Sequence, residues 1–194
     1  MSAPATIGLF VGGAGKRMGG VAKGLLAAPG GGQTLIERLL AVCARSAPDA
    51  RLYLVGQSTP YAGLGLTTLH DDPAQVGPIG GLQSLLRRAR DEGSQTALAL
   101  ACDLPFIDES IISALLQPLN GVARVPFVEG YFQPLSAAYA PAATLVAVER
   151  SLALGKHALR HVLEQLGSEV ERIEFDALQA PTLRDWDSPE DMQR

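Results

Sequence analysis

Short apolar runs alternate along the chain with longer segments in which apolar residues recur every three or four positions. The runs at residues 6–11 and 96–101 are almost wholly apolar, which is typical of strands buried in a parallel sheet. Further strands are expected at residues 51–55, 65–70, 121–128, 131–139, 169–175 and 181–184. Helices are expected at residues 34–46, 79–90, 108–117, 142–154 and 157–166. This alternation predicts a three-layer α/β/α domain with a mostly parallel, Rossmann-like sheet, formed as a single domain by residues 1–194.

Capping signals support the helix boundaries. Thr34 and Glu37 have the spacing of a capping box, and Asp108 is suited to the N-cap of the helix that follows it. The two C-terminal helices are separated at Gly155, and Ser188 is suited to capping a terminal turn. These signals favour helices that end where the apolar periodicity ends.

The first apolar run leads into a glycine-rich stretch, VGGAGKRMGGVAKGLL, at residues 11–26. Glycines allow positive φ angles and close approach of the main chain to an anion, and its N–H groups can then surround a phosphate. Arg17 and Lys23 supply positive charge in the same stretch. A flexible surface loop is the alternative interpretation, but two cations beside the end of a strand favour an anion site.

Two familiar phosphate-binding motifs do not fit this stretch. A Walker A loop needs Ser or Thr after its lysine, and here Lys16 is followed by Arg17. A dinucleotide fingerprint that begins at Gly13 needs Gly or Ala where Met18 stands. The stretch must therefore belong to another class of phosphate-binding loop.

The stretch resembles the signature L-A-G-G-x-x-x-R-M-G-G-x-D-K-x-L-L of the molybdenum cofactor guanylyltransferases, which are MobA-like NTP transferases. Phe10 and Val11 replace the leading Leu-Ala, and Ala22 replaces the aspartate. The other positions that match are Gly12, Gly13, Arg17, Met18, Gly19, Gly20, Lys23, Leu25 and Leu26. The resemblance implies a fold of the nucleotide-diphospho-sugar transferase type.

A second motif, CDLPF, occupies residues 102–106, directly after the apolar run 96–101. A carboxylate here lies at the carboxyl edge of the sheet, where open α/β sheets bind ligands, so Asp103 is placed to hold Mg²⁺. A turn aspartate before Pro105 is the alternative. The same family has C-D-x-P-F at this place, and the resemblance implies that Asp103 binds the metal.

Three weaker sites match the family as well. The segment Gly77-Pro-Ile-Gly-Gly-Leu resembles the family's G-P-L-A-G-I. At the start of a helix, Gly80 and Gly81 would leave main-chain N–H donors and space for a nucleotide. An ordinary Pro-Gly turn is the alternative interpretation. Asp71 is a candidate nucleotide contact, whereas Asp72 is expected to form a turn. Asp187 stands where the family has an asparagine, and it is either a second metal ligand or a helix cap.

Two further polar positions have competing interpretations. Gln133 stands where relatives carry histidine or glutamine before Pro-Leu, and it would either donate to the acceptor substrate or be an ordinary strand residue. His157 and His161 are four residues apart, but without a third ligand they are expected on a solvated helix face.

By this resemblance the protein is expected to transfer GMP from GTP to the terminal phosphate of molybdopterin with Mg²⁺, releasing pyrophosphate. Arg17, Lys23 and Asp103 would be catalytic, and Asp103 and Asp187 would hold the metal. The expected nucleotide-binding residues are Val11, Gly12, Gly13, Gly15, Lys16, Arg17, Gly19, Lys23, Asp71, Gly77, Pro78, Gly80, Gly81 and Asp103. An acceptor phosphate is already ionised at neutral pH, so the reaction needs positioning and charge stabilisation rather than a protein nucleophile.

Other functions remain open. The chain could be a molybdopterin cytidylyltransferase or a sugar or polyol-phosphate nucleotidyltransferase; the G-P-I-G-G-L and R-M-G-G segments favour the guanylyl pattern. Ala22 raises another alternative, a non-catalytic protein that binds a nucleotide or the cofactor. Retention of Arg17, Lys23 and Asp103 favours activity.

Composition limits the partners. The 16 basic and 20 acidic residues form no basic stripe, which argues against nucleic acid, and no apolar run is long enough to span a membrane. Cys43 and Cys102 lie in apolar segments and are expected to be buried, reduced thiols of a cytoplasmic protein. A molybdoenzyme apoprotein or its chaperone is a further expected partner.

Overall fold

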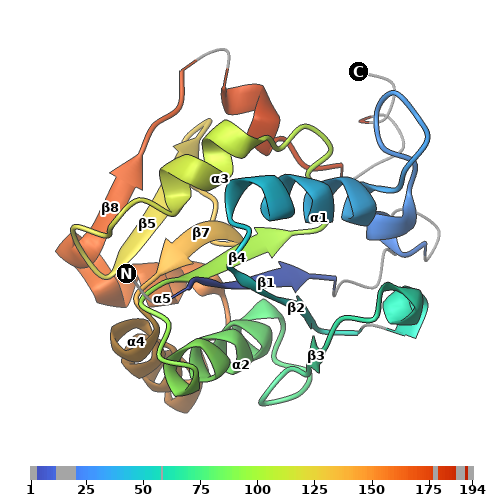
Figure 1. Cartoon of the computed structure of the whole chain (residues 1–194). Helices are drawn as coiled ribbons and strands as arrows, with labels where there is room; N and C mark the ends of the chain where they lie inside the picture. Colours follow the sequence, from blue (N-terminus) through green and yellow to red (C-terminus); the bar gives the residue numbers. More distant parts are fainter. Residues whose placement is uncertain (1–3, 12–20, 58, 177–178, 187–190, 192–194) are drawn as a thin grey trace.

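The computed structural model describes residues 4–11, 21–57, 59–176, 179–186 and 191, and these form a central sheet covered by helices on both faces (Figure 1). The strands are β1 (Thr6–Phe10), β2 (Arg51–Val55), β3 (Thr68–Leu69), β4 (Ala97–Ala101), β5 (Ala123–Val128), β6 (Tyr131–Phe132), β7 (Ser136–Tyr139) and β8 (Val170–Ile173). The α-helices are α1 (Leu35–Ser46), α2 (Pro78–Asp91), α3 (Glu109–Leu115), α4 (Pro141–Ala153) and α5 (Leu159–Leu166).

The strand order is β3-β2-β1-β4-β7-β5-β6, and β8 pairs with β5. The first four strands of this order run parallel, and β8 is parallel to β5. Strand β7 is antiparallel to both its neighbours, and β6 forms an antiparallel hairpin with β5. The sheet is thus mostly parallel at the β3–β4 end, as the alternation of elements predicted, with antiparallel pairing around β7.

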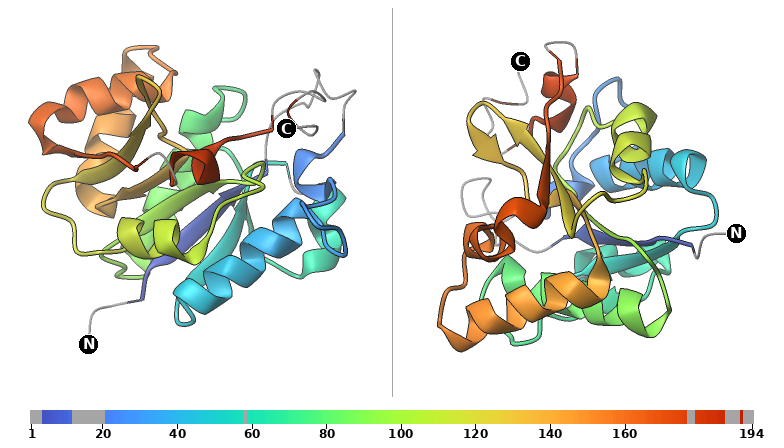
Figure 2. Two further views of the ribbon diagram at one scale, coloured as in Figure 1. Left: turned by 90° about the horizontal axis from the view of Figure 1, so that it is seen from above. Right: turned by 90° about the vertical axis from the view of Figure 1, so that its left-hand side faces the viewer.

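Two apolar clusters fill the space between the sheet and its helices. Helices α1 and α3 cover one face, and α2, α4 and α5 cover the other, which the two views of Figure 2 also show. Strand β4 contributes to both clusters because alternate side chains point to opposite faces: Leu98 and Leu100 face α1 and α3, and Ala97 and Ala99 face α2 and α4. The small alanines on one side leave room for α2 to approach closely.

Local signals account for the helix starts. Thr34 and Glu37 form the predicted capping box at the start of α1, and the Asp108 side chain accepts hydrogen bonds from the first turn of α3. Cys43 and Cys102 are buried free thiols, as expected. No helix among the described residues is long and apolar enough to cross a membrane.

Several predicted boundaries are wrong. The strand expected at 65–70 is confined to β3, and the strand expected at 131–139 is two strands, β6 and β7, separated at Gln133 to Leu135. Residues 181–184 were expected as a strand, but Ala180–Leu183 form the 3₁₀ helix η5. Helix α5 begins at Leu159, so His157 precedes it. Pro181 at the start of η5 explains one error, because proline removes a ladder donor and favours a first helical turn.

Candidate functional site

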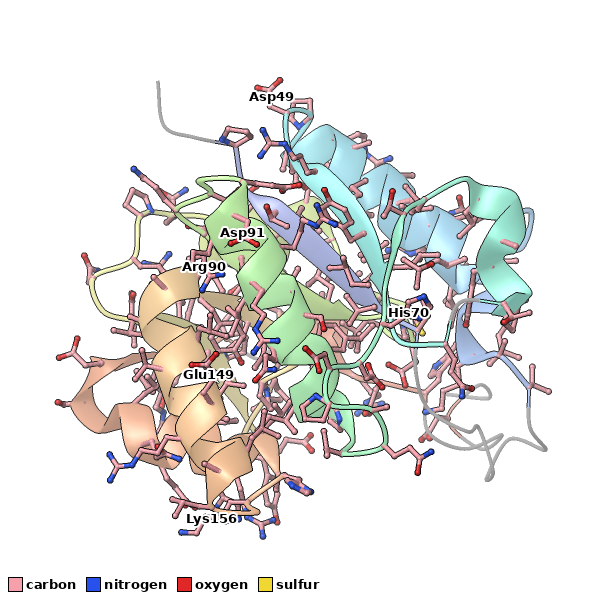
Figure 3. All side chains as sticks on the ribbon, turned by 90° about the horizontal axis from the view of Figure 1, so that it is seen from below. Asp49, His70, Arg90, Asp91, Glu149 and Lys156 are labelled. Carbon is pink, nitrogen blue, oxygen red and sulfur yellow. The ribbon has the colours of Figure 1, made fainter. Side chains whose placement is uncertain are left out.

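Four parallel strands end level with one another at one edge of the sheet. Phe10 at the end of β1 pairs with both Val55 of β2 and Ala101 of β4, and Val55 in turn pairs with Leu69 of β3. The residues that follow these strands therefore gather at one edge, where open α/β sheets bind their ligands. His70 lies at this edge and Asp49 at the opposite one, and both are labelled in Figure 3.

A cavity of about 290 Å³ opens at this edge, and it is called the first cavity below. Its wall includes residues that follow all four strands, together with the start of α2 and a residue before β7. The lining residues are Phe10, Val11, Lys23, Val55, Gly56, Asp71, Gly77, Pro78, Ala101, Cys102, Asp103 and Leu135. Six of the residues predicted to bind the nucleotide thus lie around one cavity: Val11, Lys23, Asp71, Gly77, Pro78 and Asp103.

Lys23 and Asp103 form an ion pair in the first cavity, although they are far apart in sequence. Lys23 Nζ donates to Asp103 Oδ2 at 2.8 Å, and the two side chains are 20% and 17% exposed. The pair is partly shielded from water, so its charges interact more strongly than those of an exposed pair. A cation and a carboxylate side by side can bind a phosphate and a metal ion at adjacent points.

Tyr61 fixes the main chain next to Lys23. This tyrosine lies in the 3₁₀ helix η3 (Thr59–Leu64) and is 2% exposed, and its Oη accepts a hydrogen bond from the Gly24 N–H at 3.1 Å. A Cβ on Gly24 would lie 3.0 Å from Tyr61, so a side chain at this position would crowd the tyrosine. The sequence contains no motif around Tyr61, and its role in positioning Lys23 was not foreseen.

Asp103 is held at its backbone by the C-terminal part of the chain. The Trp186 N–H donates to the Asp103 carbonyl at 3.0 Å, and the Trp186 ring packs edge-on against Phe106. The N–H of Cys102 donates to the Phe10 carbonyl, which ties β4 to the end of β1. The closing segment of the sequence therefore reaches Asp103.

The first turn of α2 fixes the segment that contains Asp71. The Asp72 N–H donates to the Gly80 carbonyl, Gln83 Nε2 donates to the Asp72 carbonyl, and Ser84 Oγ donates to the His70 carbonyl. Asp72 also pairs with Arg87, which fits a structural role. Burial raises the pKa of Asp71 above its ordinary value, and the charge of His70 only partly offsets this.

Gly80 and Gly81 are buried in this first turn, whereas Gly77 and Pro78 line the cavity. The Gly80 N–H donates to the Gly77 carbonyl, and a Cβ on Gly80 would lie 2.4 Å from the Pro73 carbonyl oxygen. A Cβ on Gly81 would lie 2.7 Å from Val55 Cγ1. Their visible role is close packing, and their predicted contact with a nucleotide stays a prediction.

Cys102 lines the cavity but is not a nucleophile. Burial raises the pKa of its thiol to about 12, and the neighbouring Asp103 charge acts in the same direction. The thiol is therefore protonated at neutral pH.

Several predicted site residues lie outside the described part of the chain. They are Gly12, Gly13, Gly15, Lys16, Arg17, Gly19 and Asp187. Gln133 is described, and it lies between β6 and β7 rather than in a strand, on the wall of two further cavities.

Comparisons with known proteins agree with this architecture. Residues 9–170 match the family model of the MobA-like NTP transferase domain. The molybdenum cofactor guanylyltransferase of Pseudomonas syringae pv. tomato is 32% identical over 167 residues, covering 84% of this chain and 80% of the relative. The enzyme of the same name from Pseudomonas aeruginosa PAO1 is 31% identical over 191 residues, covering 96% of this chain and 92% of the relative.

Solved structures share the fold. The 2-C-methyl-D-erythritol 4-phosphate cytidylyltransferase of Thermus thermophilus superimposes with a TM-score of 0.67 at 20% identity, covering 100% of this chain and 96% of that one. A nucleotidyl transferase from Methanothermobacter gives a TM-score of 0.68 at 19% identity, covering 98% and 95%. At these identities the likeness shows the nucleotide-diphospho-sugar transferase fold alone.

The family match spans most of the chain, and the matching segment contains both members of the Lys23–Asp103 pair and the strand ends around them. The chain belongs to the MobA-like NTP transferase family and is a nucleotidyltransferase.

Proposed function

We propose that this protein transfers GMP from GTP to the terminal phosphate of molybdopterin and releases pyrophosphate. The observation that carries the proposal is the Lys23–Asp103 pair in a cavity at the carboxyl edge of the sheet, in a chain whose relatives are named molybdenum cofactor guanylyltransferases. A phosphate oxygen of the acceptor attacks the α-phosphorus of GTP, a P–O bond forms, and the bond to the β-phosphate breaks. The leaving pyrophosphate takes the electron pair.

Lys23 would stabilise the negative charge that builds up on the α-phosphate during this exchange. Its ammonium group is held at one Asp103 oxygen, so it is oriented before the substrate arrives, and little reorganisation is needed. The acceptor phosphate is ionised at neutral pH, so no general base is required. Arg17 and the main chain of residues 12–20 are proposed to hold the β- and γ-phosphates.

The donor set fits a magnesium ion shared with substrate. Within the described ranges, no three His, Cys, Asp or Glu side chains are grouped so as to hold a metal, and Asp103 is the carboxylate paired with a lysine in the first cavity. Mg²⁺ typically binds one or two carboxylates together with substrate phosphates, so Asp103, with Asp187 as a second proposed ligand, suits it. When bound, the ion would neutralise phosphate charge.

Pyrophosphate release provides the test. The purified protein is incubated with Mg²⁺ and each of the four labelled ribonucleoside triphosphates in turn, with molybdopterin, a sugar phosphate or a polyol phosphate as the acceptor, and product formation is measured. GTP is expected to give the highest kcat/KM. A preference for CTP would contradict the choice of nucleotide, and turnover only with sugar or polyol phosphates would contradict the choice of acceptor. Nucleotide binding without any turnover would indicate a binding protein.

A further inference from the structure

Two more cavities continue from the first one along the sheet edge. The second cavity, of about 460 Å³, shares Pro78, Ala101, Asp103 and Leu135 with the first. The third cavity, of about 310 Å³, shares Gln133, Leu183 and Asp185 with the second. Because neighbouring cavities share wall residues, the three lie next to one another in a row, called the cleft below, that begins at Asp103 and ends at the β5–β6 hairpin.

The length of the cleft limits the size of the acceptor that can fill it. The reacting phosphate must lie near Asp103, where the first and second cavities meet. A small phosphate ester would fill only the second cavity, and the third would remain unused. An acceptor whose other end lies well away from its phosphate can occupy both cavities, as an extended phosphorylated heterocycle would.

An exposed aromatic ring lies at the far end of the cleft. Tyr131 on β6 lines the third cavity and is 74% exposed. The next residue, Phe132, packs edge-on against Phe127, and the Arg172 guanidinium lies over the Phe127 ring. Among the described residues, none makes a ring contact or a side-chain hydrogen bond with the Tyr131 side chain. A large exposed aromatic ring at the wall of a cavity is suited to stacking on a planar ligand.

Glu129 is held beside Tyr131 by an unusual turn. Val128 pairs with Tyr131, so Glu129 and Gly130 form a two-residue hairpin loop, and their φ angles are 51° and 88°. Such loops favour Asn or Asp followed by Gly, because both central residues need positive φ. Glutamate in this conformation is strained by about 1 kcal/mol or more, and residues held in such conformations concentrate at functional sites. Glu129 also lines the third cavity.

We infer that the third cavity recognises the end of the acceptor remote from its phosphate, through stacking on Tyr131 and hydrogen bonds to Glu129. The inference rests on the proposed function. A pterin ring has a flat face for the tyrosine and an edge with neighbouring N–H donors, and a carboxylate can accept from both. Tyr131 and Glu129 thus select an extended heterocyclic acceptor over a short polyol phosphate.

Steady-state kinetics test this assignment. Tyr131→Ala should raise the KM for molybdopterin roughly 5- to 10-fold, as expected for loss of one stacking contact, and leave the KM for GTP unchanged. Glu129→Gln should raise the same KM about 10-fold because an ionised acceptor is lost. Tyr131→Phe keeps the ring and should behave like the wild type, and Val146→Ala on α4 is an exposed apolar control.

A second measurement does not require transfer. 6-Hydroxymethylpterin alone should inhibit competitively against molybdopterin but not against GTP, and its fluorescence should be quenched by the wild type and by Tyr131→Phe, but not by Tyr131→Ala. If wild-type protein makes product while Tyr131→Ala and Glu129→Gln leave the KM for molybdopterin unchanged, this inference is wrong and the proposed function stands. If wild-type protein binds the pterin at Tyr131 but transfers nothing to molybdopterin, the proposed function fails and the pterin site remains.

Discussion

At the scale of single residues, Asp103 is the group on which the proposed chemistry depends most. Asp103→Asn keeps the size of the side chain and an oxygen for Lys23, but removes the negative charge. We expect kcat to fall roughly 10²- to 10³-fold, with the melting temperature within a few degrees of wild type, because the residue serves charge stabilisation. Pyrophosphate release and thermal unfolding measure the two effects.

Asp49→Asn is the matched control, because Asp49 is exposed in the turn before β2 at the opposite edge of the sheet (Figure 3). It should retain wild-type kcat. Equal activity in the Asp103 and Asp49 variants would show that Asp103 does not take part in the reaction.

Ala22 is the departure from the family signature that removes a carboxylate, and it lies among the described residues. It precedes Lys23 directly, as the residue before η2 (Lys23–Leu25), and is partly buried against the apolar cluster under α1. Ala22→Asp would restore the carboxylate of the signature next to Lys23. We expect the Kd for GTP to fall about 3- to 10-fold, in line with one charge-assisted interaction.

Isothermal titration of GTP in the presence of Mg²⁺ gives this Kd. Ala22→Asn has nearly the same shape without the charge and should bind GTP as the wild type does. A Kd that is unchanged or higher in Ala22→Asp would mean that alanine at position 22 does not weaken GTP binding. The alternative of a non-catalytic binding protein would then lose the observation on which it rests.

At the scale of elements, the start of α2 determines where the Asp71 segment lies. Gly80→Ala would place a Cβ 2.4 Å from the backbone oxygen of Pro73, which has no flexible side chain to move aside. The variant should lose about 1 to 3 kcal/mol of unfolding free energy from overpacking, more than the gain of about 1 kcal/mol in helix propensity. Chemical denaturation measures the loss.

Gly63→Ala serves as the comparison, because Gly63 has no heavy atom within 4 Å of its added Cβ and its φ is not positive. It should change the unfolding free energy little. A Gly80→Ala protein as stable as the Gly63 variant would refute the packing role of Gly80 and favour the predicted role in nucleotide contact.

Most element types could be predicted from the sequence, because apolar period and capping residues are local properties. The capping box of Thr34 and Glu37 is an example that the structure confirms. The division of residues 131–139 into β6 and β7 has a local signal in Pro134, which cannot donate a ladder hydrogen bond, but the partner of each strand is not a local property. Strand β6 pairs with β5, while β7 lies between β4 and β5.

At the scale of the whole molecule, Arg124 ties the far half of the sheet together. Its guanidinium is nearly buried, donates to main-chain carbonyls at and after the end of α3, and pairs with Glu171 of β8 at 2.9 Å. Burial alone would raise the pKa of Glu171. The hydrogen bonds and charge of Arg124, together with hydrogen bonds from Asn120, outweigh this effect and hold the pKa of Glu171 below its ordinary value of 4.5.

This lowered pKa predicts acid sensitivity. Folding favours the ionised form of Glu171. The contribution of this carboxylate to the unfolding free energy is therefore full at pH values above its pKa in the unfolded chain, and it is lost as the pH falls through the lower pKa of the folded protein. Glu171→Gln should therefore cost about 1 to 3 kcal/mol at pH 7, with the difference from wild type shrinking between about pH 5 and pH 3. Urea unfolding across this pH range measures it.

Glu174→Gln is the control for this series, because Glu174 is exposed a few residues further along the chain and pairs with Arg172 at the surface. It should change stability little at any pH. A pH-independent loss in Glu171→Gln would mean that the Arg124 pair does not titrate as described.

The sequence by itself determined the layers, the family and the positions of Lys23 and Asp103 relative to their strands, because these depend on period, composition and motifs within short windows. The tertiary structure decided that four strands end level, that Lys23 meets Asp103 across 80 residues, and that Tyr61 supports Gly24. It also placed three cavities next to one another along the sheet edge. Strand register and helix packing depend on how much apolar surface the whole core buries, and a short window of sequence does not contain that information.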